Sequence, residues 1–158
     1  MKFLKVLVLI LLPLSVFPQL VGKVVSVADG DTFTMLVKGN ERVKVRLHGI
    51  DCPEKGQDYS DVAKNHIAAL LRLSKDSVKV DVKNKDRYGR TIGIAYAGKT
   101  NFNESLLEHG LAWHYKQYDK NPKWALMEEG ARHARFNLWS LPNPVPPWEW
   151  RKKKRMKK

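Results

Sequence analysis

The chain has one cysteine, Cys52, among its 158 residues. A single cysteine cannot form an intramolecular disulfide, so stability has to come from a hydrophobic core, helped where needed by a bound ion. Histidine and cysteine residues at the spacing of zinc ligands are absent from the sequence, which argues against a zinc site. No internal repeat is visible, and a chain of this length suits one domain with a real core.

The sequence also lacks an apolar run long enough for a comfortable transmembrane helix. Its longest run, residues 6–12, lies inside the N-terminal segment 1–17, MKFLKVLVLILLPLSVF. Two lysines precede that run, a pattern that resembles a secretory signal peptide and predicts a secreted or periplasmic protein. Small residues are scarce here, and Ser15 is the best candidate for a cleavage signal. The alternative is a short membrane anchor that stays uncut.

Negative charge is in short supply: 29 Lys and Arg face 16 Asp and Glu, giving a net charge of +13. The excess is concentrated in the last eight residues, RKKKRMKK, while the body is only mildly basic. Such a tail attracts nucleic acid, anionic lipid or acidic polysaccharide without distinguishing them. We expect residues 141–158 to form a Pro/Trp-rich extension followed by a basic, disordered tail that holds polyanions or is merely solvated.

Hydrophobic periodicity predicts an α+β domain over residues 20–140. Residues 42–48 alternate cleanly between apolar and basic side chains, as a half-buried strand does. Asp29-Gly30 is a strong hairpin signal. Strands are expected at 20–27, 33–37, 42–48, 78–83 and 91–97, and helices at 60–73, 101–109 and 122–139. Five strands with a helix between the third and fourth predict a five-stranded OB-fold Greek-key β-barrel with three α-helices.

Some details of the helices follow from the same patterns. Ser60 or Asp61 is the expected N-cap of the first helix, and Gly110 is the expected C′ residue of the second. The proline-rich segment 142–150, PNPVPPWEW, is expected to be extended and to pack a tryptophan against the body. The third helix is expected to bury a stripe of five residues, Trp124, Met127, Ala131, Ala134 and Leu138.

Three acidic residues stand where strands are expected to end. Asp31 follows the 29–30 turn, and Asp51 and Glu54 follow the third strand. Carboxylates that converge repel one another unless a cation joins them, and oxygen ligands favour a hard ion such as calcium or magnesium. Composition alone favours the alternative, in which Asp31 and Asp51 are ordinary turn residues.

Arginines and aromatic residues add a second candidate feature. Arg46 lies on the polar face of the third strand, and Arg90 follows Gly89. Two guanidinium groups near a metal would suit a phosphodiester, although Arg46 could equally be one of four basic residues on a solvated strand face. Tyr88 and Tyr115 are the best candidates for stacking on bases.

The combination resembles the staphylococcal nuclease (thermonuclease) family. DGDT at 29–32, VRLHGIDCPE at 45–54 and DRYGR at 86–90 occur in the family's order. NESLLEHGLAW at 103–113 and ARHARFNLWS at 131–140 also look like family features, so the resemblance covers about 21–140. It implies a calcium-dependent endonuclease that cuts DNA and RNA, leaves 3′-phosphates and acts as a monomer without an obligate protein partner.

The resemblance also implies roles for the acidic residues. Asp31 and Asp51 match the aspartates that bind Ca²⁺, and the backbone carbonyl of Cys52 would be a further ligand. Glu54 matches the glutamate that holds or activates the attacking water. Cys52 stands where well-known members have threonine, and since only its backbone is expected to bind the metal, this difference should matter little.

The basic and aromatic roles follow in the same way. Arg46 and Arg90 match the two arginines that grip the phosphate. Arg87 would add positive charge, and Tyr88 and Tyr115 would line the nucleotide pocket. An alternative reading is a non-catalytic OB-type module that binds nucleic acid or another polyanion, but such a module has no need of the full catalytic set.

Overall fold

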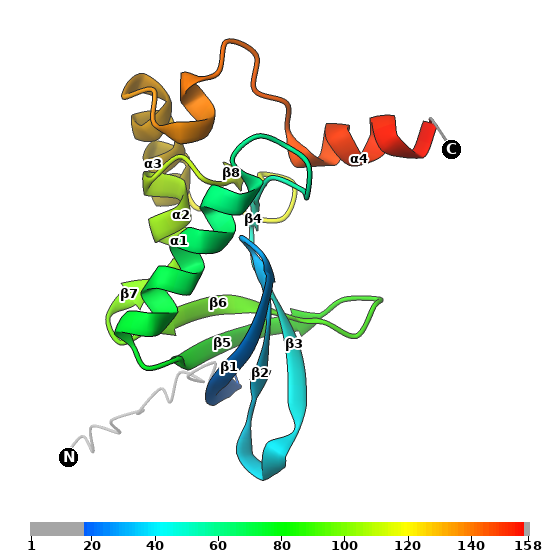
Figure 1. Cartoon of the computed structure of the whole chain (residues 1–158), viewed down its shortest axis with the longest axis vertical. Helices are drawn as coiled ribbons and strands as arrows, with labels where there is room; N and C mark the ends of the chain where they lie inside the picture. Colours follow the sequence, from blue (N-terminus) through cyan, green and yellow to red (C-terminus); the bar gives the residue numbers. More distant parts are fainter. Residues whose placement is uncertain (1–17, 157–158) are drawn as a thin grey trace, which may run out of the picture.

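The computed structural model describes residues 18–156, so the predicted signal peptide at 1–17 and its cleavage site lie outside the described part. Five strands close into a barrel in which every neighbouring pair is antiparallel except β3 and β6, whose parallel pairing completes the closure (Figure 1). The strands are β1 (Gln19–Asp29), β2 (Thr32–Leu36), β3 (Arg42–Leu47), β5 (Ser77–Lys85) and β6 (Thr91–Ala97). The predicted five-stranded OB-type barrel is confirmed.

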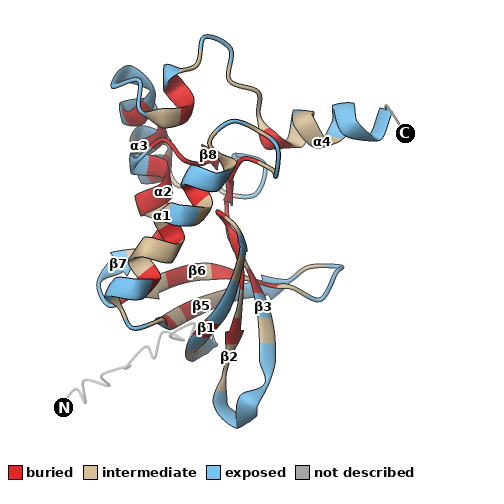
Figure 2. Cartoon of the chain, in the orientation of Figure 1, coloured by how far each residue is buried: buried red, intermediate tan, exposed pale blue. Residues whose placement is uncertain are grey.

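The barrel interior is filled by the apolar side chains of the alternating strands. Phe33 and Met35 of β2 and Val45 of β3 are fully buried, while the intervening residues of these strands are more exposed. Figure 2 shows this buried interior continuing from the barrel into the helices stacked over it. Burial of apolar surface on this scale supplies the main stabilisation, as a chain without a disulfide requires.

Two helices pack on the barrel, α1 (Ser60–Leu73) and α2 (Phe102–Glu108), and a third, α3 (Pro122–His133), packs on α2. The bounds of α1 are those predicted, and Ala63, Ile67 and Leu71 form its buried stripe. The predicted N-cap is wrong, because Tyr59 caps α1 in a left-handed conformation and no side chain bonds the first turn. Gly110 has the positive φ expected of the C′ residue after α2.

The third helix is shorter than predicted. It ends at His133 because Arg135 adopts a left-handed conformation, and the N–H groups of Arg135 and Phe136 donate to the carbonyls of Arg132 and Ala131. This is a Schellman motif formed without glycine, so the sequence carries no ordinary signal for it. Ala134 is therefore exposed rather than part of a buried stripe.

The C-terminal prediction needs a larger correction. Residues 147–156, expected to be partly extended and then disordered, form a fourth helix, α4 (Pro147–Met156). Proline is tolerated in the first turn of a helix, so the proline run can end by starting one. The expected tryptophan contact is present, because Trp148 packs edge-on against Trp113. In Figure 1, α4 projects from the body beside the short strands β4 and β8.

Short elements complete the chain: η1 (Lys38–Asn40), β4 (Ile50–Asp51), β7 (Thr100–Asn101), β8 (Trp113–His114) and η2 (Asn137–Ser140). β4 and β8 pair outside the barrel sheet, so Asp51 is aligned with Trp113. Among the described helices, none combines the length and the apolar character needed to cross a membrane.

Candidate active site

The turn between β1 and β2 delivers Asp31 to the end of the barrel. Asp29 pairs with Thr32, so Gly30 and Asp31 are the two turn residues, one position later than the hairpin signal predicts. Gly30 is needed here for space, since a Cβ would lie 2.7 Å from Ala63 Cβ and 2.9 Å from Cys52 Sγ. The glycine therefore lets the turn pack directly on α1 and on Cys52.

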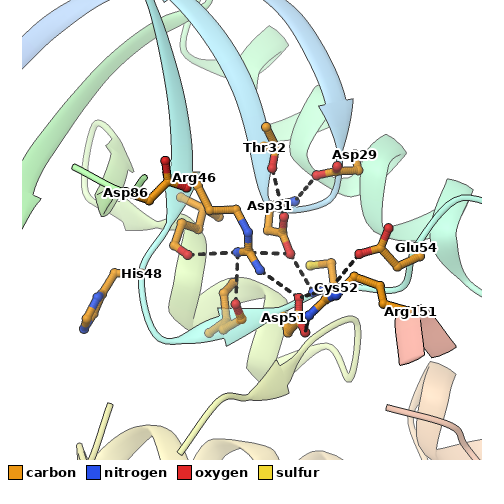
Figure 3. A network of polar contacts seen from close by, with 12 residues as sticks. Asp29, Asp31, Thr32, Arg46, His48, Asp51, Cys52, Glu54, Asp86 and Arg151 are labelled. Carbon is orange, nitrogen blue, oxygen red and sulfur yellow. Dashed lines mark hydrogen bonds and ion pairs between the residues drawn. The ribbon is translucent and has the colours of Figure 1, made fainter. Parts of the chain in front are cut away.

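Arg46 joins the two aspartates that the sequence predicts to be together (Figure 3). Its Nη1 lies 3.1 Å from Asp31 Oδ2, and its Nη2 donates to Asp51 Oδ1 at 2.7 Å. Nη1 also donates to the carbonyl oxygens of Leu47 and Ile50, at 2.9 and 3.0 Å. Three hydrogen bonds and the ion pair with Asp31 thus fix the guanidinium, which excludes the alternative in which Arg46 belongs to a solvated strand face.

The backbone of Cys52 closes the cluster from the other side. Its N–H donates to Asp31 Oδ2 at 2.6 Å, and the hydroxyl of Thr32 donates to Asp31 Oδ1 at 3.1 Å. The thiol of Cys52 is buried, and burial raises its pKa well above the usual value. Cys52 therefore contributes its main chain to the site, while its side chain packs in the core.

Charge balance in this cluster is tight because it is buried. Burial raises the pKa of Asp31; Arg46 opposes that rise, while the carboxyls of Asp29 and Asp51 reinforce it. Burial would lower the pKa of Arg46, but Asp31 and Asp51 outweigh that effect and raise it. More carboxylates than Arg46 can neutralise meet at one point, so the ionised site calls for further positive charge.

That further charge comes from a residue that sequence reasoning missed. Arg151 of α4 donates through Nη1 to Glu54 Oε1 at 2.6 Å and through Nη2 to Asp51 Oδ2 at 2.8 Å. The contact spans about a hundred residues of chain. Nothing in the sequence distinguishes Arg151 from the other basic residues of the tail, so only the fold could identify it.

Arg90 lies outside the cluster of Asp31, Asp51 and Glu54. It follows the 86–89 turn, and its Nε donates to Asp86 Oδ2 at 2.7 Å. Arg46 is aligned with Ile92 of β6, so continuation of that register puts Arg90 on the same face as Arg46. Burial tends to raise the pKa of Asp86, but hydrogen bonds from Arg90 and Tyr88 outweigh it and lower that pKa. Asp86 therefore stays ionised and fixes the guanidinium of Arg90.

The predicted nucleotide-pocket residues lie on two different elements. Tyr88 is 69% exposed at the tip of the turn, where Arg87 donates to its hydroxyl at 2.7 Å. Tyr115 instead stacks on Trp148 of α4, with ring centroids 4.9 Å apart and planes 12° apart. Tyr88 is open to a ligand, whereas α4 covers Tyr115. Their roles in binding stay predictions.

The donor set fits a hard cation. Asp31 and Asp51 are buried carboxylates and supply oxygen, the ligand atom that such an ion prefers. The main chain of Cys52 lies beside Asp31 through its N–H, and the role of its carbonyl stays a prediction. Within residues 18–156, no three His, Cys, Asp or Glu side chains are arranged to hold a metal ion. The guanidinium groups of Arg46 and Arg151 are bound to Asp51 in this arrangement. The residues suit calcium in kind and in charge, and the position of Arg151 has to change for Asp51 to bind it.

Comparisons with known proteins identify the family of this chain. The family model for staphylococcal nuclease homologues matches residues 44–141, more than half of the chain. The chain belongs to the staphylococcal nuclease family. The matched residues include β3 from residue 44, the loop that carries Asp51 and Glu54, and the DRYGR turn, whereas the turn with Asp31 and helix α4 lie outside the match.

Several curated relatives have nuclease names. A micrococcal nuclease of Shigella flexneri is 41% identical over 143 residues, covering 83% of this chain and 80% of that protein. An uncharacterized endonuclease of Haemophilus influenzae is 39% identical over 134 residues, covering 85% of this chain and 74% of that protein. A staphylococcal-like nuclease of Arabidopsis thaliana is 43% identical, with 73% of this chain matching 35% of that longer protein.

Proposed function

We propose that this protein is a nuclease that hydrolyses phosphodiester bonds of DNA and RNA with calcium as its cofactor. The observation that carries the proposal is the buried cluster in which Arg46 bridges Asp31 and Asp51, with Glu54 beside it. Family membership and the names of the relatives support the same activity. A fold of this type alone would not be sufficient, because OB-type barrels serve many functions.

The arginines are assigned to the phosphate. A phosphodiester resists attack because its oxygens are negatively charged, and Arg46 and Arg90 offer bidentate donors to those oxygens. Arg46 comes from inside the cluster and Arg90 from the position just before β6, so the two can contact one phosphate from different directions. Arg90 is assigned to the leaving 5′ oxygen, which gives products with a 3′-phosphate.

Glu54 is assigned to the water. Its side chain is 39% exposed, so solvent reaches it, while Asp51 beside it is almost fully buried. Glu54 can therefore orient a water molecule for in-line attack and accept its proton. Asp31, Asp51 and the Cys52 carbonyl would hold calcium, which when bound supplies positive charge close to the phosphate.

Cellular location and the tail complete the proposal. The composition of residues 1–17 supports a secreted or periplasmic protein. Lysines 152–154 and Arg155 on α4 are exposed and would attract the polyanionic substrate. We expect the protein to act as a monomer.

The test is cleavage of single-stranded DNA and of RNA in calcium, in magnesium and in chelator, with the phosphate end of the products determined. We expect cleavage in calcium, none in chelator, and 3′-phosphate ends. Asp51→Asn should abolish cleavage, whereas Asp58→Asn, an exposed aspartate in the same loop, should not. Binding without cleavage in every condition would contradict the proposal and indicate an OB-type binding module.

A further inference from the structure

The C-terminal helix α4 returns to the candidate active site and contacts it at two points. Arg151 holds three carboxylate oxygens: Glu54 Oε1 at 2.6 Å, Asp51 Oδ2 at 2.8 Å and Asp51 Oδ1 at 3.2 Å. One turn earlier on the helix, Trp148 stacks in parallel on Tyr115. A single helix thus covers a predicted metal ligand, the predicted water-activating residue and a predicted base-stacking residue.

The polar contacts of Arg151 exclude a metal from Asp51. Calcium takes oxygen ligands at about 2.3–2.6 Å, usually six to eight of them, and like charges repel at such range. Both oxygens of Asp51 already accept from Arg151, and Oδ1 accepts from Arg46 as well. Asp51 can serve the guanidinium of Arg151 or a calcium ion, but not both in this arrangement.

The aromatic contact resembles what a nucleotide base would make. The Trp148 and Tyr115 rings are 12° from parallel, the geometry of a stacked base on an aromatic platform. The segment that leads into α4 is tied down as well, because Gln57 Nε2 donates to the carbonyl of Val145 at 3.0 Å. Gln57 in turn accepts from the N–H of Glu54, so the segment before α4 is anchored to the loop that carries Glu54.

We propose that α4 is an intramolecular competitor that closes the active site: Arg151 and calcium bind Asp51 alternatively, and Arg151 also holds Glu54 while the site is closed. The proposal rests on the proposed function, since it takes Asp51 as a calcium ligand. In the closed state Arg151 supplies the charge that the buried carboxylates need. In the open state, in which α4 has left the site, calcium would supply this positive charge instead. Nucleic acid would favour the open state by binding the lysine and arginine side chains of α4.

The test is the affinity for calcium alone, measured by calorimetry on the whole chain without nucleic acid. Arg151→Ala should bind calcium more tightly, by about tenfold, within the range usual for coupled sites. Arg155→Ala is the matched control, because it removes the same charge from an exposed position on the same helix and should bind like the wild type. Trp148→Ala should also bind more tightly, since it loosens α4 without touching a carboxylate.

A spectroscopic measurement reports the movement itself. Calcium should change the tryptophan fluorescence of the wild type, because Trp148 leaves Tyr115, and this change should be smaller in Trp148→Phe, in which only Trp113 and Trp150 still report the movement. Equal calcium affinities in the wild type and Arg151→Ala would overturn the competition and leave the nuclease proposal standing. Failure of every variant to bind calcium would overturn both.

Discussion

Replacing Arg46 with methionine should destabilise the protein far more than the same change at Arg90. The side chain of Arg46 is 14% exposed, and its partners Asp31 and Asp51 are 6% and 1% exposed. Removing one partner of a buried ion pair leaves uncompensated charge and costs about 3–5 kcal/mol. We expect the lower end of that range, because Arg151 still pairs with Asp51, and Asp31 keeps its Cys52 and Thr32 donors.

The matched control is Arg90→Met. Arg90 is 29% exposed and pairs with Asp86 in a turn, where a pair is worth about 1 kcal/mol or less. Both variants should lose activity under the proposed function, but only Arg46→Met should lose stability. If Arg46→Met lowers the free energy of unfolding by about 3 kcal/mol, its midpoint of thermal unfolding should fall by about 6–12 °C.

The assay is urea unfolding at pH 7 with chelator present, so that no metal contributes to stability. In an Asp31→Asn background, Arg46→Met should lower the free energy of unfolding by less, since only the Asp51 carboxylate then loses its Arg46 partner. The reasoning fails if the free energy of unfolding of Arg46→Met lies within about 1 kcal/mol of the wild-type value, or if Arg90→Met is destabilised as much as Arg46→Met.

Two further predictions concern positions around the site. Asp86→Asn should lower activity about ten- to a hundredfold by releasing Arg90, with Asp58→Asn unchanged. Because Asp86 has a lowered pKa, it is ionised at neutral pH and loses its hold on Arg90 only at a pH below the usual range of an aspartate. An Asp86→Asn enzyme with full activity would contradict this role. Gly30→Ala should cost about 1–3 kcal/mol in urea unfolding, because its Cβ would meet Ala63 and Cys52. Gly130→Ala, in open space on α3, should be neutral or slightly stabilising. If Gly130→Ala were the more destabilising of the two changes, the 30–31 turn would not be tightly packed.

Much of the fold could be predicted because local and long-range signals agree. The bounds of α1 and β6 were predictable since apolar residues recur at helical spacing in one and alternate in the other. The C-terminal end of α3 and the existence of α4 were not predictable, because Arg135 takes a conformation that usually signals glycine, and because prolines obscured the helix that follows them. In both places tertiary packing decides what the local sequence leaves open.

The candidate site also contains residues that the sequence predicts and one that it does not. Asp31, Arg46, Asp51 and Glu54 lie within two short motifs, and the pairing of β2 with β3 brings those motifs together. Arg151 lies beyond every motif, and its contact with Glu54 depends on how α4 packs after a long chain excursion. Its assignment required the structure.

The measurement that tests the central claim most directly is the kcat of Glu54→Gln on single-stranded DNA at saturating calcium. The account predicts that kcat falls by about 10²–10⁴-fold, while calcium still binds and the protein remains folded. Glu129→Gln, an exposed glutamate on α3, should retain the wild-type kcat. A Glu54→Gln enzyme that cleaves DNA at close to the wild-type rate would contradict the account.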